Sequence, residues 1–289
     1  MKNLCKLVWT TLFGGHNERI DGPGLFSGEY TNAGQYQELQ TLYGSHPTIR
    51  MPYHKQFAKE FRQAAGLATR SGARVVALLD QFESNDVMMN CLATIKRDLP
   101  FIKHIELFNE LPHMQYPGQN IASLEELIIR TNKYTDHIHA TMPGVKVLTM
   151  APYNSIDERE FEAWAGVTNT RILKDLILYT AADIATVHIY GDSTSKRLQM
   201  IKLADNLKEW NDEAAHEKEL WITEIGVDGW GEQVEYYKVM VRLAVNILNP
   251  ATIIWYRQSI DTAGSPDATF SMEYRDTGEK SPLWKHIQK

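Results

Sequence analysis

The sequence predicts an α/β protein with a (β/α)8 TIM barrel, in a single domain that spans residues 1–289. Short apolar runs rich in β-branched residues alternate with longer segments of helical periodicity. This alternation is typical of parallel strands joined by helical crossovers. The length of 289 residues is also close to that of one such barrel, about 250 residues.

The predicted strands number eight and share an apolar centre. They cover residues 6–12, 48–53, 73–80, 104–109, 146–151, 184–190, 220–225 and 252–257. Eight strand–helix units favour a closed barrel over an open doubly wound sheet. The turn after the first run, Gly14-Gly15-His16-Asn17, matches neither the dinucleotide-binding nor the phosphate-binding glycine pattern.

Several of the intervening segments predict helices clearly. Ser123 with Glu126 three residues later is a capping box, and that helix should end before Pro143. The other clear helical patterns cover residues 55–69, 196–211 and 232–249, the last ending at Pro250.

Composition and charge narrow the class of partner. The formal net charge is −6, and there is no basic stripe of the kind that binds nucleic acid. No stretch approaches the 18 apolar residues of a membrane span. We therefore expect no nucleic-acid partner, no membrane span and a monomer. The apolar start is interrupted by Lys6 and lacks a cleavage site, so it does not resemble a signal peptide. The compartment stays open between the cytoplasm and a location reached with a leader since removed.

Cysteine and histidine spacing does not indicate a metal or redox site. Cys5 and Cys91 form no CxxC pair, and two buried thiols are favoured over one disulfide. His137 and His139 are two residues apart on a predicted helix and cannot face the same ion, and no HExxH motif occurs. We expect no metal and no cofactor.

Two glutamates stand at the ends of apolar strands. Glu110 follows the fourth predicted strand and Glu224 lies at the end of the seventh. The strand ends form the active-site face of a (β/α)8 barrel, and a carboxylate there is costly unless it is solvated, paired or used. Strands four and seven lie across the barrel mouth from each other, so the two carboxyl groups can meet. Cleavage of a glycosidic bond requires such a pair.

The two motifs resemble the signatures of the clan A glycoside hydrolases. Asn109-Glu110 is similar to the acid/base motif after strand four, and Thr223-Glu224 with Gly226 is similar to the nucleophile motif after strand seven. The resemblance extends from about Trp9 to Trp255. It implies a retaining glycosidase that cleaves β-linked oligo- or polysaccharides, with Glu110 as acid/base and Glu224 as nucleophile.

The resemblance also implies roles for surrounding side chains. Its substrate-site residues are Arg50, Asn109, His188, Tyr190 and Trp255, the last as the floor of the sugar site. Trp230, in the loop after strand seven, is a further candidate because aromatic rings stack on sugar faces, although ordinary packing explains it equally well. Arg50 and Tyr190 should keep the pKa of Glu224 low, whereas burial and the charge of Glu224 should raise that of Glu110.

Some features leave alternatives open. Glu106 is expected to be a buried structural glutamate paired with an arginine, and Arg50 could hold Glu106, Glu224 or both. Leu111 replaces the proline that usually follows the acid/base, with Pro112 one step later. The lack of long insertions favours endo cleavage. A non-catalytic carbohydrate-binding barrel, a transglycosylase and a metal-dependent aldolase or isomerase are the competing functions.

Overall fold

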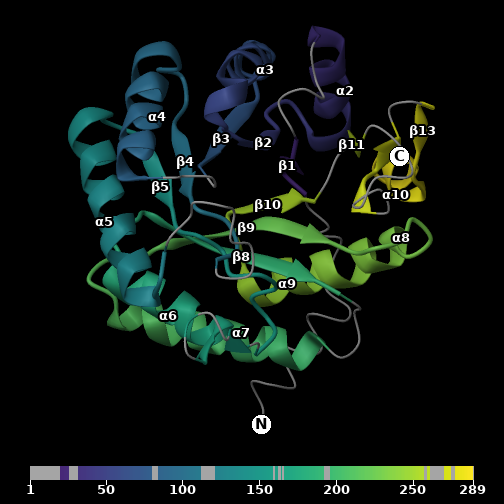
Figure 1. Cartoon of the computed structure of the whole chain (residues 1–289). Helices are drawn as coiled ribbons and strands as arrows, with labels where there is room; N and C mark the ends of the chain where they lie inside the picture. Colours follow the sequence, from purple (N-terminus) through teal and green to yellow (C-terminus); the bar gives the residue numbers. More distant parts are fainter. Residues whose placement is uncertain are drawn as a thin grey trace.

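The computed structural model describes residues 20–25, 32–79, 84–111, 121–158, 160–161, 164, 166–191, 196–256, 259–260, 270–274 and 277–288. Within them, eight strands form one parallel sheet in the order β1-β10-β9-β8-β5-β4-β3-β2 (Figure 1). The strands are β1 (Gly22–Pro23), β2 (Thr48–Pro52), β3 (Arg74–Leu79), β4 (His104–Leu107), β5 (Lys146–Leu148), β8 (Ile184–Tyr190), β9 (Glu219–Gly226) and β10 (Thr252–Trp255).

The first strand closes the sheet into a barrel. Gly22 pairs with Ile254 of β10, and Gly24 forms a parallel bridge to Arg50 of β2. A side chain at Gly22 would overlap the carbonyl group of Thr48, so glycine permits this close approach. We predicted residues 6–12 for this place in the barrel; β1 occupies it in the structure, and residues 6–12 lie outside the described part of the chain.

Helices surround the barrel, and two small sheets accompany it (Figure 1). The helices are α2 (Ala33–Tyr43), η1 (Lys55–Phe57), α3 (Ala58–Arg70), α4 (Asn85–Asp98), α5 (Leu124–Thr141), α6 (Asn169–Tyr179), α7 (Lys196–Glu213), α8 (Gln233–Tyr236), the π-helical η3 (Tyr237–Val241), α9 (Arg242–Leu248) and α10 (Pro282–Ile287). The small sheets pair β6 (Glu160–Phe161) with β7 (Val167–Thr168), and β11 (Ser259–Ile260) with β12 (Glu273–Tyr274) and β13 (Glu279–Lys280).

The predicted helices are present with small differences. Ser123 caps α5 by accepting a hydrogen bond from the backbone of Glu126, whereas the Glu126 side chain accepts from the backbone of Ala122. Residues 232–249 form α8, the π-helical turn η3 and α9 in succession rather than one regular helix.

The strands alternate between two environments. Side chains such as Ile49, Ile105 and Ile189 pack outward in the cores between the barrel and the helices. A separate apolar cluster, formed from four strands, fills part of the barrel interior. Its members are Val76, Leu148, Ile184 and Trp221. The strands thus form a packed core, and their carboxyl ends are left for polar side chains.

Strand β9 contains an irregularity that changes this alternation. In the pairing with β8, Val187 is opposite Ile222 but His188 is opposite Glu224, so Thr223 is an extra residue. Thr223 and Glu224 consequently both contact inward-facing partners, whereas Ile222 and Ile225 pack in the outer core.

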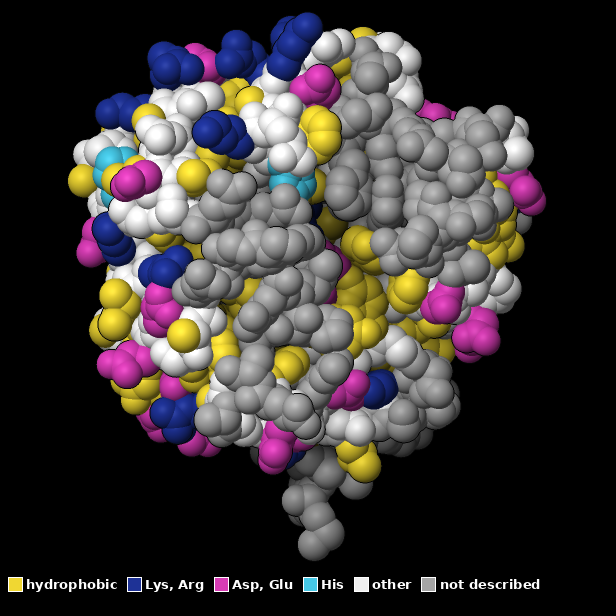
Figure 2. Space-filling model, viewed as in Figure 1, with side chains coloured by type: hydrophobic (Ala, Val, Ile, Leu, Met, Phe, Trp, Pro, Cys, Tyr) yellow, Lys and Arg dark blue, Asp and Glu magenta, His cyan; other side chains and the backbone are white. Residues whose placement is uncertain are grey.

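Other properties of the described residues are plain. Charged side chains of both signs are scattered over the face shown in Figure 2. No helix among the described residues is both long and apolar enough to cross a membrane. Cys91 is a buried free thiol, and Cys5 lies outside the described residues.

Candidate active site

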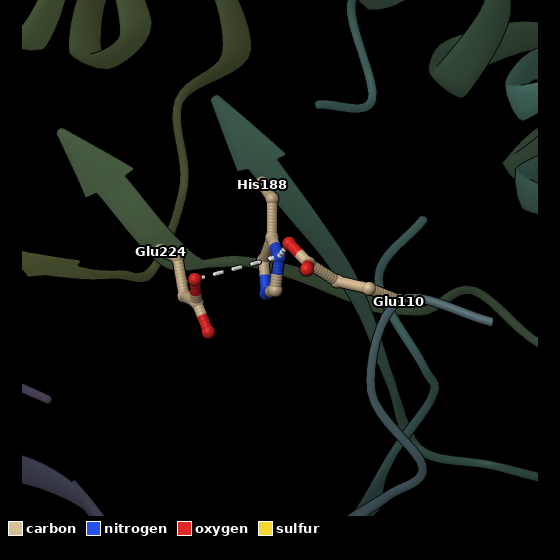
Figure 3. Close-up of side chains that lie close together, drawn as sticks. All are labelled: Glu110, His188 and Glu224. Atoms are coloured by element: carbon tan, nitrogen blue, oxygen red, sulfur yellow. Dashed lines mark hydrogen bonds and ion pairs between the residues drawn. The ribbon is translucent and has the colours of Figure 1, made fainter. Parts of the chain in front are cut away.

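The two glutamates and one histidine come together at the carboxyl ends of the strands. Nδ1 of His188 lies 2.6 Å from Oε1 of Glu110 and 3.7 Å from Oε2 of Glu224. One atom from each of the three side chains lies within 4.8 Å of the other two. Figure 3 shows the imidazole between the two carboxyl groups, with Glu224 on β9, His188 on β8 and Glu110 after β4.

The chain after β4 is held in an uncommon backbone conformation. Phe108 has φ 67° and Glu110 has φ 47°, the left-handed region that residues other than glycine seldom adopt. Backbone hydrogen bonds from Phe108 to Leu79 and from Glu110 to Ala151 hold this bend between the neighbouring strands. Strain of this kind often marks a functional site, and here it accompanies a buried carboxyl group.

Arg50 links Glu106 of β4 to Glu224 of β9. Its Nε lies 2.5 Å from Glu106 Oε2, and its Nη2 donates to Glu106 Oε1 at 3.0 Å and to Asn109 Oδ1 at 2.8 Å. Its Nη1 donates to Glu224 Oε1. Arg50 therefore holds Glu106 and Glu224 together. Glu106 is fully buried, as predicted for a structural partner, and also accepts a hydrogen bond from Thr223.

Tyr190 completes the surroundings of Glu224. Its hydroxyl donates a hydrogen bond to Glu224 Oε2. Burial raises the pKa of Tyr190 well above its ordinary value, and the charges of Glu224 and Glu110 add to this. The phenol of Tyr190 therefore stays protonated, and can donate this hydrogen bond, at neutral and moderately alkaline pH.

The environment shifts the pKa of Glu224 downward. Burial by itself would raise it, but the charges of His188 and Arg50 and hydrogen bonds from Tyr190 and Arg50 outweigh that effect. Glu224 is thus the carboxyl group that is ionised more readily than an ordinary glutamate.

The pKa of Glu110 moves the opposite way. Burial raises it, opposed by the hydrogen bond and charge of His188, and the charge of Glu224 raises it further. The pKa of His188 is also raised: burial lowers it, but the charge of Glu224 and the hydrogen bond to Glu110 outweigh burial. Two neighbouring carboxyl groups with opposite shifts are suited to different roles in one reaction, one as a proton donor and one as an anion.

The same three side chains are the one group in the described residues that could ligate a metal ion. The charge distribution does not favour a cation there. The guanidinium group of Arg50 already bonds to Glu224, and an added metal would lie beside its positive charge.

The structure contradicts one predicted substrate contact. Trp255 is fully buried and packs edge-on against Tyr236 in the outer core, with ring centroids 6.1 Å apart. Trp255 has the same strand parity as Ile253, and both side chains point toward the helices. Trp255 therefore cannot form the floor of a sugar site.

Tyr256, the next residue along the chain, lies beside Tyr190 and hence close to the site. The ring of Tyr256 lies 6.0 Å from that of Tyr190 and 5.9 Å from that of Phe270. Tyr153 packs on Tyr190 as well, at 6.0 Å. Sequence reasoning missed Tyr256, although the alternation from Ile253 onward would have placed it on the inner face.

Trp230 packs against the C-terminal segment of the chain. Its ring stacks on Tyr274 at 4.1 Å, and its Nε1 donates to the carbonyl group of Ser271 at 2.6 Å. Its place at a sugar site, like that of Asn109, stays a prediction.

Comparisons with known proteins identify the fold. No protein-family model matches the chain, and no curated protein matches it. Solved structures do match. An endo-1,4-β-mannanase from Rhizomucor miehei superposes with a TM-score of 0.62 at 11% identity, over 90% of this chain and 94% of that one. An endo-β-1,4-glucanase from Xanthomonas axonopodis pv. citri gives 0.61 at 13% identity, over 93% and 97%. The chain has the (β/α)8 barrel fold.

A third match has a different stated linkage. A GH128 endo-β-1,3-glucanase from Lentinula edodes gives a TM-score of 0.59 at 11% identity, over 93% of this chain and 98% of that one. The similar structures thus include enzymes named for mannan and for two linkages of glucan, so the shared fold does not select a substrate.

Proposed function

We propose that this protein is a retaining glycoside hydrolase that cleaves β-linked glycans, with Glu224 as nucleophile and Glu110 as acid/base. The observation that carries the proposal is the pair itself: two buried carboxyl groups with opposite pKa shifts and oxygens within 4.8 Å. Retaining enzymes need a separation of about 5–5.5 Å, whereas inverting enzymes need about 6.5–9.5 Å to admit a water molecule. The resemblance of the motifs to clan A glycosidases and the shared fold support the same assignment.

The two steps follow from the charges. Glu224 attacks the anomeric carbon while Glu110 gives its proton to the leaving oxygen, which breaks the glycosidic bond and forms a glycosyl ester on Glu224. The negative charge of Glu224 then disappears, and with it one cause of the raised pKa of Glu110. Glu110 next takes a proton from water, the oxygen of that water attacks the anomeric carbon, and the carboxylate of Glu224 is released.

The first test is sugar release from a panel of β-1,4-mannan, β-1,4-glucan and β-1,3-glucan. Internal cleavage gives mixed oligosaccharides and indicates an endo enzyme. Products longer than a defined oligosaccharide substrate would indicate a transglycosylase. No release from any polysaccharide, together with measurable binding, would favour the non-catalytic carbohydrate-binding barrel.

The second test separates the roles of the two glutamates. Glu224→Ala should lower activity by at least about 10³-fold on every substrate. Glu110→Ala should lower it by about 10²–10⁴-fold where the leaving group needs a proton, and far less on an aryl glycoside with an acidic phenol. Glu217→Ala, at an exposed position just before the start of β9 and thus at the opposite end of the strand from Glu224, is the matched control. Full activity of Glu224→Ala would overturn the proposal.

The metal-dependent alternative has its own test. Exhaustive dialysis against a chelator should leave glycosidase activity unchanged, because Arg50 already supplies the positive charge beside Glu224. Loss of activity that returns with a divalent metal would favour the alternative.

A further inference from the structure

A ladder of side chains replaces a neighbouring strand along one edge of β8. Strand β5 pairs with β8 at a single position, Leu148 with Ile184. Beyond it, the backbone N–H groups of Thr186, His188 and Tyr190 donate to side-chain oxygens instead of to a strand backbone. The acceptors are Thr149 Oγ1 at 3.1 Å, Ser155 Oγ at 3.0 Å and Asn154 Oδ1 at 2.9 Å.

The two outer steps of this ladder come from one turn, residues 152–157. Ser155 also donates its own backbone N–H to the carbonyl group of His188, at 2.8 Å. Asn154 has φ 46°, a left-handed conformation that asparagine tolerates better than most residues. The turn therefore pairs with the end of β8 through specific hydrogen bonds. Its residues Asn154 and Ser155 are both buried.

A single side chain on helix α6 holds this turn from behind. Nδ2 of Asn169 donates to the carbonyl groups of Tyr153 at 2.8 Å, Asp157 at 2.9 Å and Asn154 at 3.2 Å. Asn169 is fully buried. An amide group that donates to several main-chain carbonyls at once fixes the shape of the turn, because it holds these carbonyls around one point. The carbonyl group of Asn154 also accepts from the backbone N–H of Asp157, at 2.9 Å, which closes the turn from within.

The residues held by the turn are those that contact the two carboxyl groups. His188 lies against Glu110, and Tyr190 donates to Glu224. We propose that the turn of residues 152–157, braced by Asn169, positions the carboxylate pair by fixing the backbone of β8 at His188 and Tyr190. Asn154, Ser155 and Asn169 are thus positioning residues that act through β8 and contact no reacting atom.

The variants for the test are Asn169→Ala, which removes the brace, and Ser155→Ala, which removes the acceptor of the His188 N–H. Ser155→Thr restores a hydroxyl group. Asn132→Ala is the matched control. Asn132 also bonds two main-chain groups, donating to Tyr179 at 2.8 Å and accepting from Ala181 at 2.7 Å, but it does so before the start of β8.

We expect Asn169→Ala and Ser155→Ala to lower kcat by about tenfold, since small displacements of reacting groups are costly. Both limbs of the pH profile of kcat/KM should move to higher pH, because Glu110 and Glu224 lose hydrogen bonds that lower their pKa values. Ser155→Thr should recover much of the rate. Asn132→Ala should lower the melting temperature without moving either limb.

A second readout does not require catalysis. The ring of His188, identified by NMR as the signal missing from His188→Gln, should titrate at lower pH in Asn169→Ala and in Ser155→Ala because its bond to Glu110 is loosened. The change in rate depends on the proposed glycosidase function, whereas this titration does not. If the wild type cleaves no glycan, the proposed function fails and the titration still decides.

Folded Asn169→Ala and Ser155→Ala proteins with wild-type pH limbs and a wild-type His188 titration would overturn the proposal. If Asn169→Ala does not fold, the comparison of Ser155→Ala with Ser155→Thr decides by the same two measurements.

Discussion

Nδ1 of His188 lies 2.6 Å from Oε1 of Glu110, so a buried imidazole is in direct contact with the carboxyl group proposed to donate a proton. The imidazole lowers the pKa of Glu110, opposing the effect of burial, and its charge lowers that of Glu224 too. One ring therefore influences both ends of the pH range in which the pair is correctly protonated.

Replacing His188 should move the whole pH profile. In His188→Gln, the pKa values of Glu110 and Glu224 both rise, so both limbs of kcat/KM shift to higher pH. Tyr190→Phe removes a hydrogen bond to Glu224 and should shift the acidic limb upward with a smaller effect on the alkaline limb. The measurement is kcat/KM against pH for the three proteins. An unmoved acidic limb in Tyr190→Phe would contradict the assignment of that limb to Glu224.

Removing Arg50 should destabilise the protein strongly. Arg50→Met leaves Glu106 and Glu224 buried without their common cation, which should cost about 3–5 kcal/mol of unfolding free energy. Arg62→Met, which breaks an ion pair whose arginine side chain is 53% exposed, should cost at most about 1 kcal/mol. Urea unfolding of both variants is the test. Equal losses would show that burial of the Arg50 network has little energetic consequence.

The two aromatic residues at the end of β10 should behave differently. Trp255→Ala leaves a cavity in the outer core and should cost about 3–5 kcal/mol of stability. Tyr256→Ala should weaken glycan binding, measured as a higher KM, with a smaller loss of stability because Tyr256 is only partly buried. A raised KM in a folded Trp255→Phe protein with no change in Tyr256→Ala would reverse this assignment.

Lys218 should make stability depend on pH in the alkaline range. Its buried ammonium group donates to the carbonyl groups of Thr180 at 2.9 Å and Ala182 at 2.7 Å, and burial lowers its pKa to about 8. The pKa of a lysine in an unfolded chain is about 10.4. Between these values the unfolded state binds more protons, so this group makes the free energy of unfolding rise as pH increases.

The check is the difference in unfolding free energy between the wild type and Lys218→Met from pH 7.5 to 10.5. The free energy of unfolding of the wild type minus that of Lys218→Met should increase as pH rises. Lys208→Met, at a side chain that is 77% exposed, should give a difference independent of pH apart from its ion pair with Asp212. A flat difference for Lys218→Met would contradict the lowered pKa.

Much of the barrel could be predicted from sequence because its strands are buried on both faces. Runs such as residues 184–190 are mostly apolar or β-branched and are bounded by helical patterns, so the predicted limits of this strand agree with those of β8. The two glutamates were predictable for a related reason. A charged group directly after such a run must lie at the end of a strand, and the barrel brings those ends together.

The remaining features depend on geometry that the residue pattern does not record. Strand β1 is only Gly22–Pro23, without an apolar run, and it is a strand because its neighbours close around it. The direction of Trp255 depends on its register against β9. The ladder from Thr149, Asn154 and Ser155 to β8 joins residues more than 30 positions apart through side chains. Asparagine and serine after a strand ordinarily indicate only a turn.

The extra residue in β9 separates what the fold needs from what the proposed chemistry needs. A chain lacking Thr223 would retain the inward Trp221, the outward Ile222 and the outward Ile225, so its hydrophobic pattern and packing would survive. Its glutamate would still lie opposite His188, because the pairs on either side of Thr223, Val187 with Ile222 and His188 with Glu224, would then follow each other in regular register. The deletion would remove the hydroxyl group that donates to Glu106 and the local twist that a bulge adds to its strand. A protein shortened by one codon should therefore keep its barrel and its glutamate opposite His188, and the change would lie in the direction from which that carboxyl group enters the site.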